Sequence, residues 1–179
     1  MIETITFSKW FTTTLLVEVF MLYLFRFTLS PFSGVDINNW YTNFKWSAII
    51  LDVLSVLIGF YLAKFTYKYL IKNNIINEKN YIIKFLIILL IIQISHDFLF
   101  YFTTLKNAVK GKNKIIDELV TYANNVKTGA VIGDSFMYLI SIPILFYFVN
   151  NNNSEVNTFI SIVSLYLIGY FLYQKPIVN

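Results

Sequence analysis

The stretch Ile82-Ile-Lys-Phe-Leu-Ile-Ile-Leu-Leu-Ile-Ile-Gln-Ile-Ser-His-Asp-Phe-Leu-Phe-Tyr-Phe-Thr-Thr-Leu105 decides the class of fold. It is almost entirely apolar, and about 20 such residues in a helix cross the hydrocarbon core of a bilayer. In lipid every backbone N–H and C=O must be satisfied within the segment, so an isolated span of this length must be helical. The stretch therefore predicts a transmembrane helix, with Gln93, His96 and Asp97 placed inside it.

Four other stretches have a similar length and apolar character. The chain of 179 residues is 57% apolar and only 13% charged, whereas soluble domains are about a quarter charged. No polar segment between the stretches approaches the size of a domain. We therefore predict an all-α, multi-pass integral membrane protein that forms one transmembrane domain over residues 1–179, a bundle of five helices. The predicted spans are 10–29, 46–66, 82–105, 129–149 and 156–173.

Three connections between the spans carry further predictions. The segment 30–34, Ser-Pro-Phe-Ser-Gly, ends the first helix. The short polar turn at 150–153 predicts that the last two spans are antiparallel neighbours. In 106–128, apolar residues recur at helical spacing among polar ones, which predicts an amphipathic helix on the membrane surface or an N-terminal extension of the fourth span. The apolar set is Ile116, Leu119, Val120, Ala123 and Val126.

Composition excludes several kinds of site. The chain has no cysteine and a single histidine, His96, so it holds neither a thiolate metal site nor a haem with two axial histidines. No lysine lies deep within a span, and a retinal Schiff base is therefore not expected. The net charge of +4 comes from lysines outside the spans, which is typical of loops that meet anionic headgroups rather than of nucleic-acid binding. The expected partner is the lipid bilayer, and a charged pore would require a homo-oligomer.

Ionisable side chains lie inside the spans at similar depth. Each of the first four spans carries an ionisable residue within about two helical turns of the same membrane face. These residues are Arg26, Asp52, Asp97 and Asp134. A charge in lipid costs at least about 2.5 kcal/mol, so such residues usually face a partner or a water-filled cavity. We therefore predict a polar pocket in one leaflet, in which Arg26 offsets one carboxylate and protonated His96 offsets another.

The candidate pocket residues share helix faces. Gln93, His96 and Asp97 have the spacing i, i+3 and i+4, which places them on one side of a helix. The predicted ion, proton or ligand pocket comprises Arg26, Asp52, Gln93, His96, Asp97, Asp134 and Tyr138, with Glu18, Ser55, Asn124 and Ser141 as secondary candidates. Carboxylate oxygens and one imidazole suit a divalent cation. Its candidate ligands are Asp52, His96, Asp97 and Asp134.

Other interpretations of the same residues stay open. Intramembrane Asp, Gln and Ser form hydrogen bonds between helices, and an Arg–Asp pair can fix helix register. The carboxyls could also relay protons, or act as general acid and base on a lipid substrate. No spacing matches a metalloprotease HExxH, a phosphate-binding glycine loop or a nucleophile elbow. An enzyme is therefore not the favoured prediction.

Two sequence elements carry a resemblance to a known family. They are Gln93-Ile-Ser-His96-Asp97-Phe-Leu-Phe-Tyr101 and Tyr122-Ala-Asn124-Asn-Val-Lys-Thr-Gly129-Ala-Val-Ile-Gly133-Asp134-Ser135-Phe-Met137. An HD pair and a GDS element on successive spans resemble an uncharacterised five-span membrane protein family of large nucleocytoplasmic DNA viruses. The abundance of Ile, Asn, Lys, Phe and Tyr, typical of A+T-rich genomes, agrees with it. The resemblance implies location in a viral or host internal membrane.

Three functional hypotheses follow. The favoured one is a virus-encoded membrane protein whose polar pocket binds an ion, a proton or a small polar ligand, as a transport or ligand-binding component. The first alternative is a structural virion or assembly membrane protein without a ligand site. The second is a membrane-embedded lipid-modifying enzyme that uses His96 and Asp97.

Overall fold

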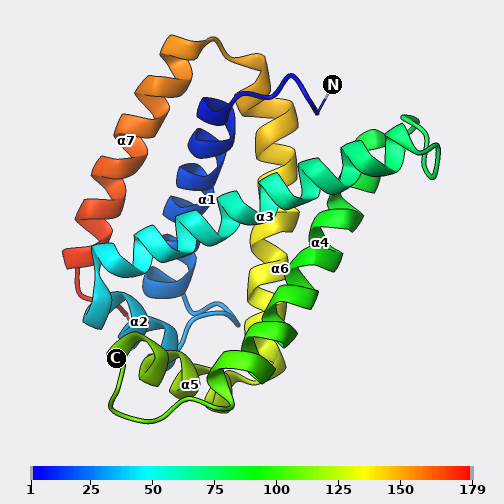
Figure 1. The fold of residues 1–179 in the computed structure, drawn as a ribbon. Helices are drawn as coiled ribbons and strands as arrows, with labels where there is room; N and C mark the ends of the chain where they lie inside the picture. The colour runs from blue at the N-terminus through cyan, green and yellow to red at the C-terminus, as the bar shows by residue number, and fades with distance from the viewer. Residues whose placement is uncertain (1, 178–179) are drawn as a thin grey trace.

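The computed structural model describes residues 2–177 as a helical bundle (Figure 1). Within these residues, five helical segments are long and apolar enough to cross a membrane. They are α1 (Phe7–Phe27), α3 (Trp46–Lys72), α4 (Tyr81–Phe100) with a π-helical turn (Tyr101–Leu105), α6 (Thr128–Pro143) with a π-helical turn (Ile144–Phe148) and a 3-10 turn (Val149–Asn151), and α7 (Ser154–Tyr173). The predicted all-α fold with five candidate spans is confirmed.

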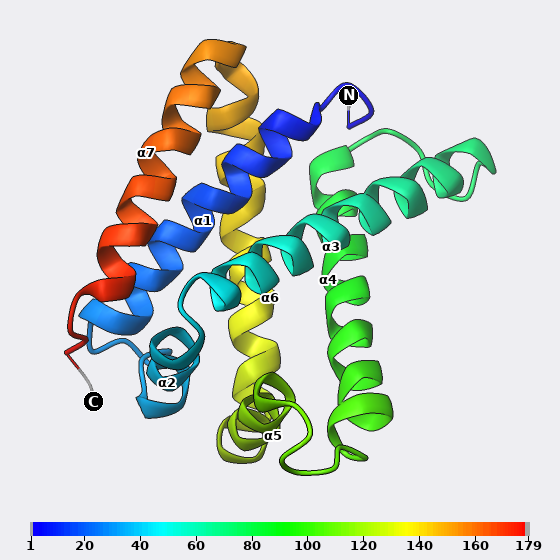
Figure 2. The same cartoon turned by 60° about the vertical axis from the view of Figure 1, so that its left-hand side comes forward.

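The first helix, α1, is the most buried of the five spans. It contacts α3, α6 and α7, and α4 contacts both α3 and α6, so α1, α3, α4 and α6 form a closed ring of four helices. The seventh helix packs along α1 on the outside of this ring (Figures 1 and 2). The last two spans run antiparallel, as predicted, and Asn157 Nδ2 of α7 donates to the Val149 carbonyl at 3.1 Å near the turn that joins them, but α7 makes its main contact with α1.

Hydroxyl groups explain the close packing of α7 on α1. Thr12 Oγ1 lies 2.8 Å from Ser161 Oγ of α7, and small polar residues let membrane helices approach closely. Thr12, Thr13 and Thr14 are all buried and each donates to the backbone carbonyl four residues earlier, at 2.9, 2.8 and 3.0 Å. These hydroxyls are thus satisfied inside an apolar bundle.

Two short helices lie side by side at one end of the bundle: α2 (Val35–Phe44) and α5 (Lys114–Val126) (Figure 2). The predicted amphipathic helix is α5, which begins at the Asn113 cap and ends where Lys127 takes a left-handed φ of 56°. That turn separates α5 from α6, so the alternative of an extended fourth span is wrong. The other short helix was not predicted.

Aromatic side chains fill the bundle toward the opposite end. The ring of Trp10 lies 4.6 Å from Phe60 and 5.8 Å from Phe85, and Phe60 meets the edge of Tyr138 at 5.6 Å. Tyr138 of α6 fits against Gly59 of α3, where a Cβ atom would collide with its hydroxyl group. Gly59 therefore permits the contact between these two spans.

We predict that Gly59→Ala lowers the midpoint of thermal unfolding (Tm), because the new methyl group displaces Tyr138. Overpacking of this kind costs about 1–3 kcal/mol. Gly133→Ala is the matched control, since Gly133 is also a buried glycine in a span but a Cβ there meets nothing within 4 Å. Thermal unfolding of the three proteins in one detergent measures the difference, and equal Tm values for Gly59→Ala and wild type would contradict this packing.

Candidate functional site

The first acidic pair joins α1 to α3. Glu18 is fully buried, and its carboxyl group is close enough to that of Asp52 for their charges to interact. The Tyr41 hydroxyl lies beside both carboxyl groups, and Trp40 Nε1 donates a hydrogen bond of 3.1 Å to Asp52 Oδ2. Both aromatic residues come from α2, so the short helix supplies polar partners to acids inside the spans.

Tyr41 lies outside the spans, and the pKa of its hydroxyl depends on the two carboxyl groups beside it. Burial raises the pKa of the Tyr41 hydroxyl well above its ordinary value, and the carboxyls of Glu18 and Asp52 raise this pKa further. Tyr41 is therefore neutral at physiological pH and keeps its proton for donation to a carboxylate.

The second acidic pair joins α4 to α6. The carboxyl groups of Asp97 and Asp134 are close enough to interact, and Asp134 is also within electrostatic reach of Asp52. Gln93 Nε2 donates a hydrogen bond of 2.6 Å to Asp97 Oδ1. Tyr122 of α5 lies near this pair, and the pKa of its hydroxyl is raised by burial first and by Asp134 second. The two pairs therefore adjoin inside the ring of four helices.

The sequence around these acids is repeated. Asn43-Phe-Lys45-Trp-Ser-Ala-Ile-Ile-Leu-Asp52 corresponds to Asn125-Val-Lys127-Thr-Gly-Ala-Val-Ile-Gly-Asp134, with identical Asn, Lys, Ala, Ile and Asp at matching positions. Lys45 and Lys127 end the two short helices with nearly the same backbone angles, φ 48° and ψ −120° against φ 56° and ψ −127°. Each half of the chain thus leads from a short helix through a left-handed lysine to a span that carries an aspartate.

Contacts between the halves follow the same correspondence. Asn43 Nδ2 donates to Glu118 Oε2 at 3.3 Å, and Asn125 Nδ2 donates to Asp36 Oδ1 at 2.8 Å. An offset of 82 residues relates the two contacts, because it turns Asn43 into Asn125 and Asp36 into Glu118. The same offset relates Val56 to Tyr138, and the Tyr138 hydroxyl donates to the Val56 carbonyl at 3.5 Å.

Reciprocal contacts of this kind are expected when a twofold axis relates the two halves of the chain. The corresponding spans α3 and α6 begin at the same end of the bundle (Figure 1), so the two halves are parallel repeats related by an axis that runs from one end of the bundle to the other. In this symmetry α1 corresponds to α4, which agrees with the ring of contacts.

The structure brings several of the predicted residues together. Asp52, Asp97 and Asp134 lie within electrostatic reach of one another or of a common neighbour. Gln93 and Tyr138 are buried beside them, at 6% and 1% exposure, and the charges of Asp134 and Asp97 act on Tyr138.

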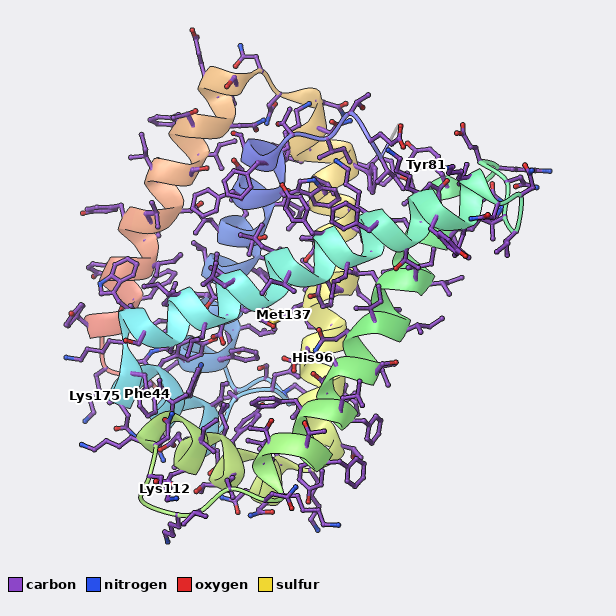
Figure 3. The ribbon with its side chains drawn as sticks, viewed as in Figure 1. Phe44, Tyr81, His96, Lys112, Met137 and Lys175 are labelled. Atoms are coloured by element: carbon purple, nitrogen blue, oxygen red, sulfur yellow. The ribbon has the colours of Figure 1, made fainter. Side chains whose placement is uncertain are left out.

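Other predicted residues lie elsewhere. The His96 side chain is 58% exposed and stacks on Phe100, although its Nδ1 lies 3.3 Å from Asp97 Oδ1. Ser55 and Asn124 are exposed. Ser141 is buried but donates to the carbonyl of Met137 at 2.6 Å within its own helix. These four residues lie on four different helices, α4, α3, α5 and α6, and Figure 3 shows His96 on α4.

Arg26 does not offset a carboxylate. Its guanidinium donates to the Thr42 hydroxyl at 3.3 Å and to the carbonyls of Asn38 and Gln174 at 3.5 and 3.0 Å. Over residues 2–177 it forms no salt bridge. The depth of Arg26 in the first span predicted a position beside the acids. Its side chain instead contacts α2 and the residue that follows α7.

The candidate metal ligands are not assembled as a metal site. Among the described residues, no three histidine, aspartate or glutamate side chains are grouped so that they could hold a metal ion.

Sequence reasoning missed the aromatic partners of the acids and the importance of Glu18. Both signals were present in the chain. Ile37, Trp40, Tyr41 and Phe44 have the i, i+3, i+4, i+7 spacing of an amphipathic helix, and the repeated segments would have shown that Trp40 corresponds to Tyr122.

Comparisons of the chain with protein-family models, with curated proteins and with solved structures found no match. The resemblance to a viral membrane protein family stays a prediction.

We predict that Trp40→Phe destabilises the protein by about 1–3 kcal/mol, because it removes the N–H group that satisfies Asp52 and leaves a half-buried carboxyl oxygen without that donor. Trp46→Phe serves as the control, since Trp46 is 37% exposed and no acid is bonded to it. Chemical unfolding in detergent compares the two. A loss of stability no larger than that of Trp46→Phe would show that the indole N–H is dispensable.

Proposed function

We propose that this integral membrane protein binds and releases protons at its two acidic pairs, as the proton-binding part of a transport or ligand-binding component. One observation carries the proposal: each half of the chain places a pair of carboxyl groups inside the spans, and the two pairs adjoin. Within residues 2–177, Glu18, Asp52 and Asp134 form no salt bridge with a basic side chain.

Physical chemistry connects this arrangement to protons. Carboxylates whose charges interact in a buried region repel each other, so binding of a proton by one member relieves the repulsion. Neutral Tyr41 and Tyr122 stand beside the two pairs as hydroxyl groups that can donate or accept. The charges of Asp134 and Asp52 also interact, so proton binding at one pair influences proton binding at the other.

The donor set favours protons over a divalent cation. Ca²⁺ takes six to eight oxygen ligands and Mg²⁺ about six in octahedral geometry, whereas among the described residues no three histidine, aspartate or glutamate side chains are grouped so that they could hold a metal ion. A proton needs no such group, because a single carboxyl group can bind and release it.

A structural role is the second candidate, and specific contacts favour it. Trp40 bonds to Asp52, and Gln93 bonds to Asp97, so the acids also serve as hydrogen-bond acceptors between and within helices. For location we propose the viral or host internal membrane implied by the resemblance, which is supported by the HD and GDS elements alone.

Proton flux through liposomes separates these two roles. We expect reconstituted wild-type protein to dissipate an imposed pH gradient, followed with a pH-sensitive dye inside the vesicles. Asp134→Asn and Asp52→Asn should each reduce this rate at least about tenfold, since the amide keeps the shape of the side chain but cannot bind the proton. Glu78→Gln in an exposed loop is the control and should transport as wild type does.

The thermal stability of each variant is measured in parallel. Normal folding with lost flux supports proton binding. Flux equal to wild type in both aspartate variants contradicts the proposal, and a lowered Tm in those variants would then assign the acids to helix packing.

A further inference from the structure

A second site lies at a corner of the bundle, apart from the acidic pairs. A cavity of about 440 Å³ opens where α1 ends, α3 begins and α7 ends, with α2 along one side. Three cationic side chains line it, Arg26, Lys45 and Lys175, and none of its lining residues is acidic. Figure 3 shows Lys175 close to Phe44, the last residue of α2, at this corner.

Arg26 is the buried one of the three cationic side chains that line the cavity. It is only 2% exposed, and its guanidinium meets a hydroxyl and two carbonyls but no carboxylate. Its Nε is buried without a hydrogen-bond partner. A buried charge without a counter-charge is costly, so this guanidinium is ready to pair with an anion.

The other two cations stand nearer the surface. Lys45 Nζ lies over the ring of Tyr173 at 4.7 Å from its centroid, and both Lys45 and Lys175 are exposed. Asn39 and Thr42 add an amide and a hydroxyl to the lining. The cavity opens at the ends of three spans, the level at which phospholipid headgroups lie.

We propose that this cavity binds the phosphate group of an anionic ligand, with an anionic phospholipid headgroup as the source that its membrane position favours. Arginine suits phosphate through two parallel N–H donors, and lysines contribute point charges. A cluster of cations at the headgroup level also attracts anionic lipids. The site uses none of the paired carboxyls, so it is independent of the proton-binding function.

The test uses the full chain in detergent and measures Tm with short-chain phosphatidylglycerol, short-chain phosphatidylcholine or inorganic phosphate. The variant is Lys45→Gln with Lys175→Gln. Arg26 is left intact because its hydrogen bonds tie α1 to α2 and to the segment after α7. The matched control is Lys127→Gln with Lys112→Gln, which removes the same charge. Lys127 also ends a short helix with a left-handed φ, as Lys45 does.

We expect phosphatidylglycerol, but not phosphatidylcholine, to raise the Tm of the wild type and of the control. In Lys45→Gln with Lys175→Gln the apparent affinity should fall at least about tenfold. A similar response to inorganic phosphate would support the phosphate site and assign it to a soluble anion instead of a lipid. Equal responses to the two lipids, no response to any anion, or equal loss in the control variant would overturn the proposal.

Discussion

The contact between α2 and α5 closes one end of the bundle, and the surroundings of the acidic residues of the long helices depend on it. Two reciprocal amide-to-carboxylate hydrogen bonds join the short helices. From this layer Trp40 and Tyr41 reach the first acidic pair, and Tyr122 reaches the second. Polar partners are thus supplied from the membrane surface to groups that would be costly to bury alone. The other end is packed with aromatic rings and threonine hydroxyls, so it is Asp52, Asp97 and Asp134 that lie toward the end closed by the short helices.

The fold could be predicted from the sequence because a bilayer leaves the backbone few choices. Length and hydropathy place all five spans to within a few residues, and heptad-like spacing locates α5. Which spans pack together could not be predicted, since lipid-facing and protein-facing surfaces are both apolar in a membrane protein. The position of α7 on α1 depends on Thr12 and Ser161, a pair that only the three-dimensional structure brings into contact.

The candidate site could be predicted in part for a related reason. Depth along a span is read directly from the sequence, and it predicted a group of Asp52, Asp97 and Asp134, whose charges interact in the structure. Direction around the helix axis requires knowledge of the neighbours. Arg26 and His96 have suitable depth, but Arg26 turns toward the cavity at the end of α7, and the His96 side chain is 58% exposed. The internal repeat supplies the missing information, because corresponding residues in two halves must have corresponding surroundings.

The helix α7 breaks the equivalence of the two halves. It covers α1 and not the corresponding α4. Glu18 is fully buried, whereas the Asp97 side chain is 16% exposed beside the exposed His96. The two acidic pairs therefore differ in the exposure of their members, although the segments that carry them repeat each other in sequence.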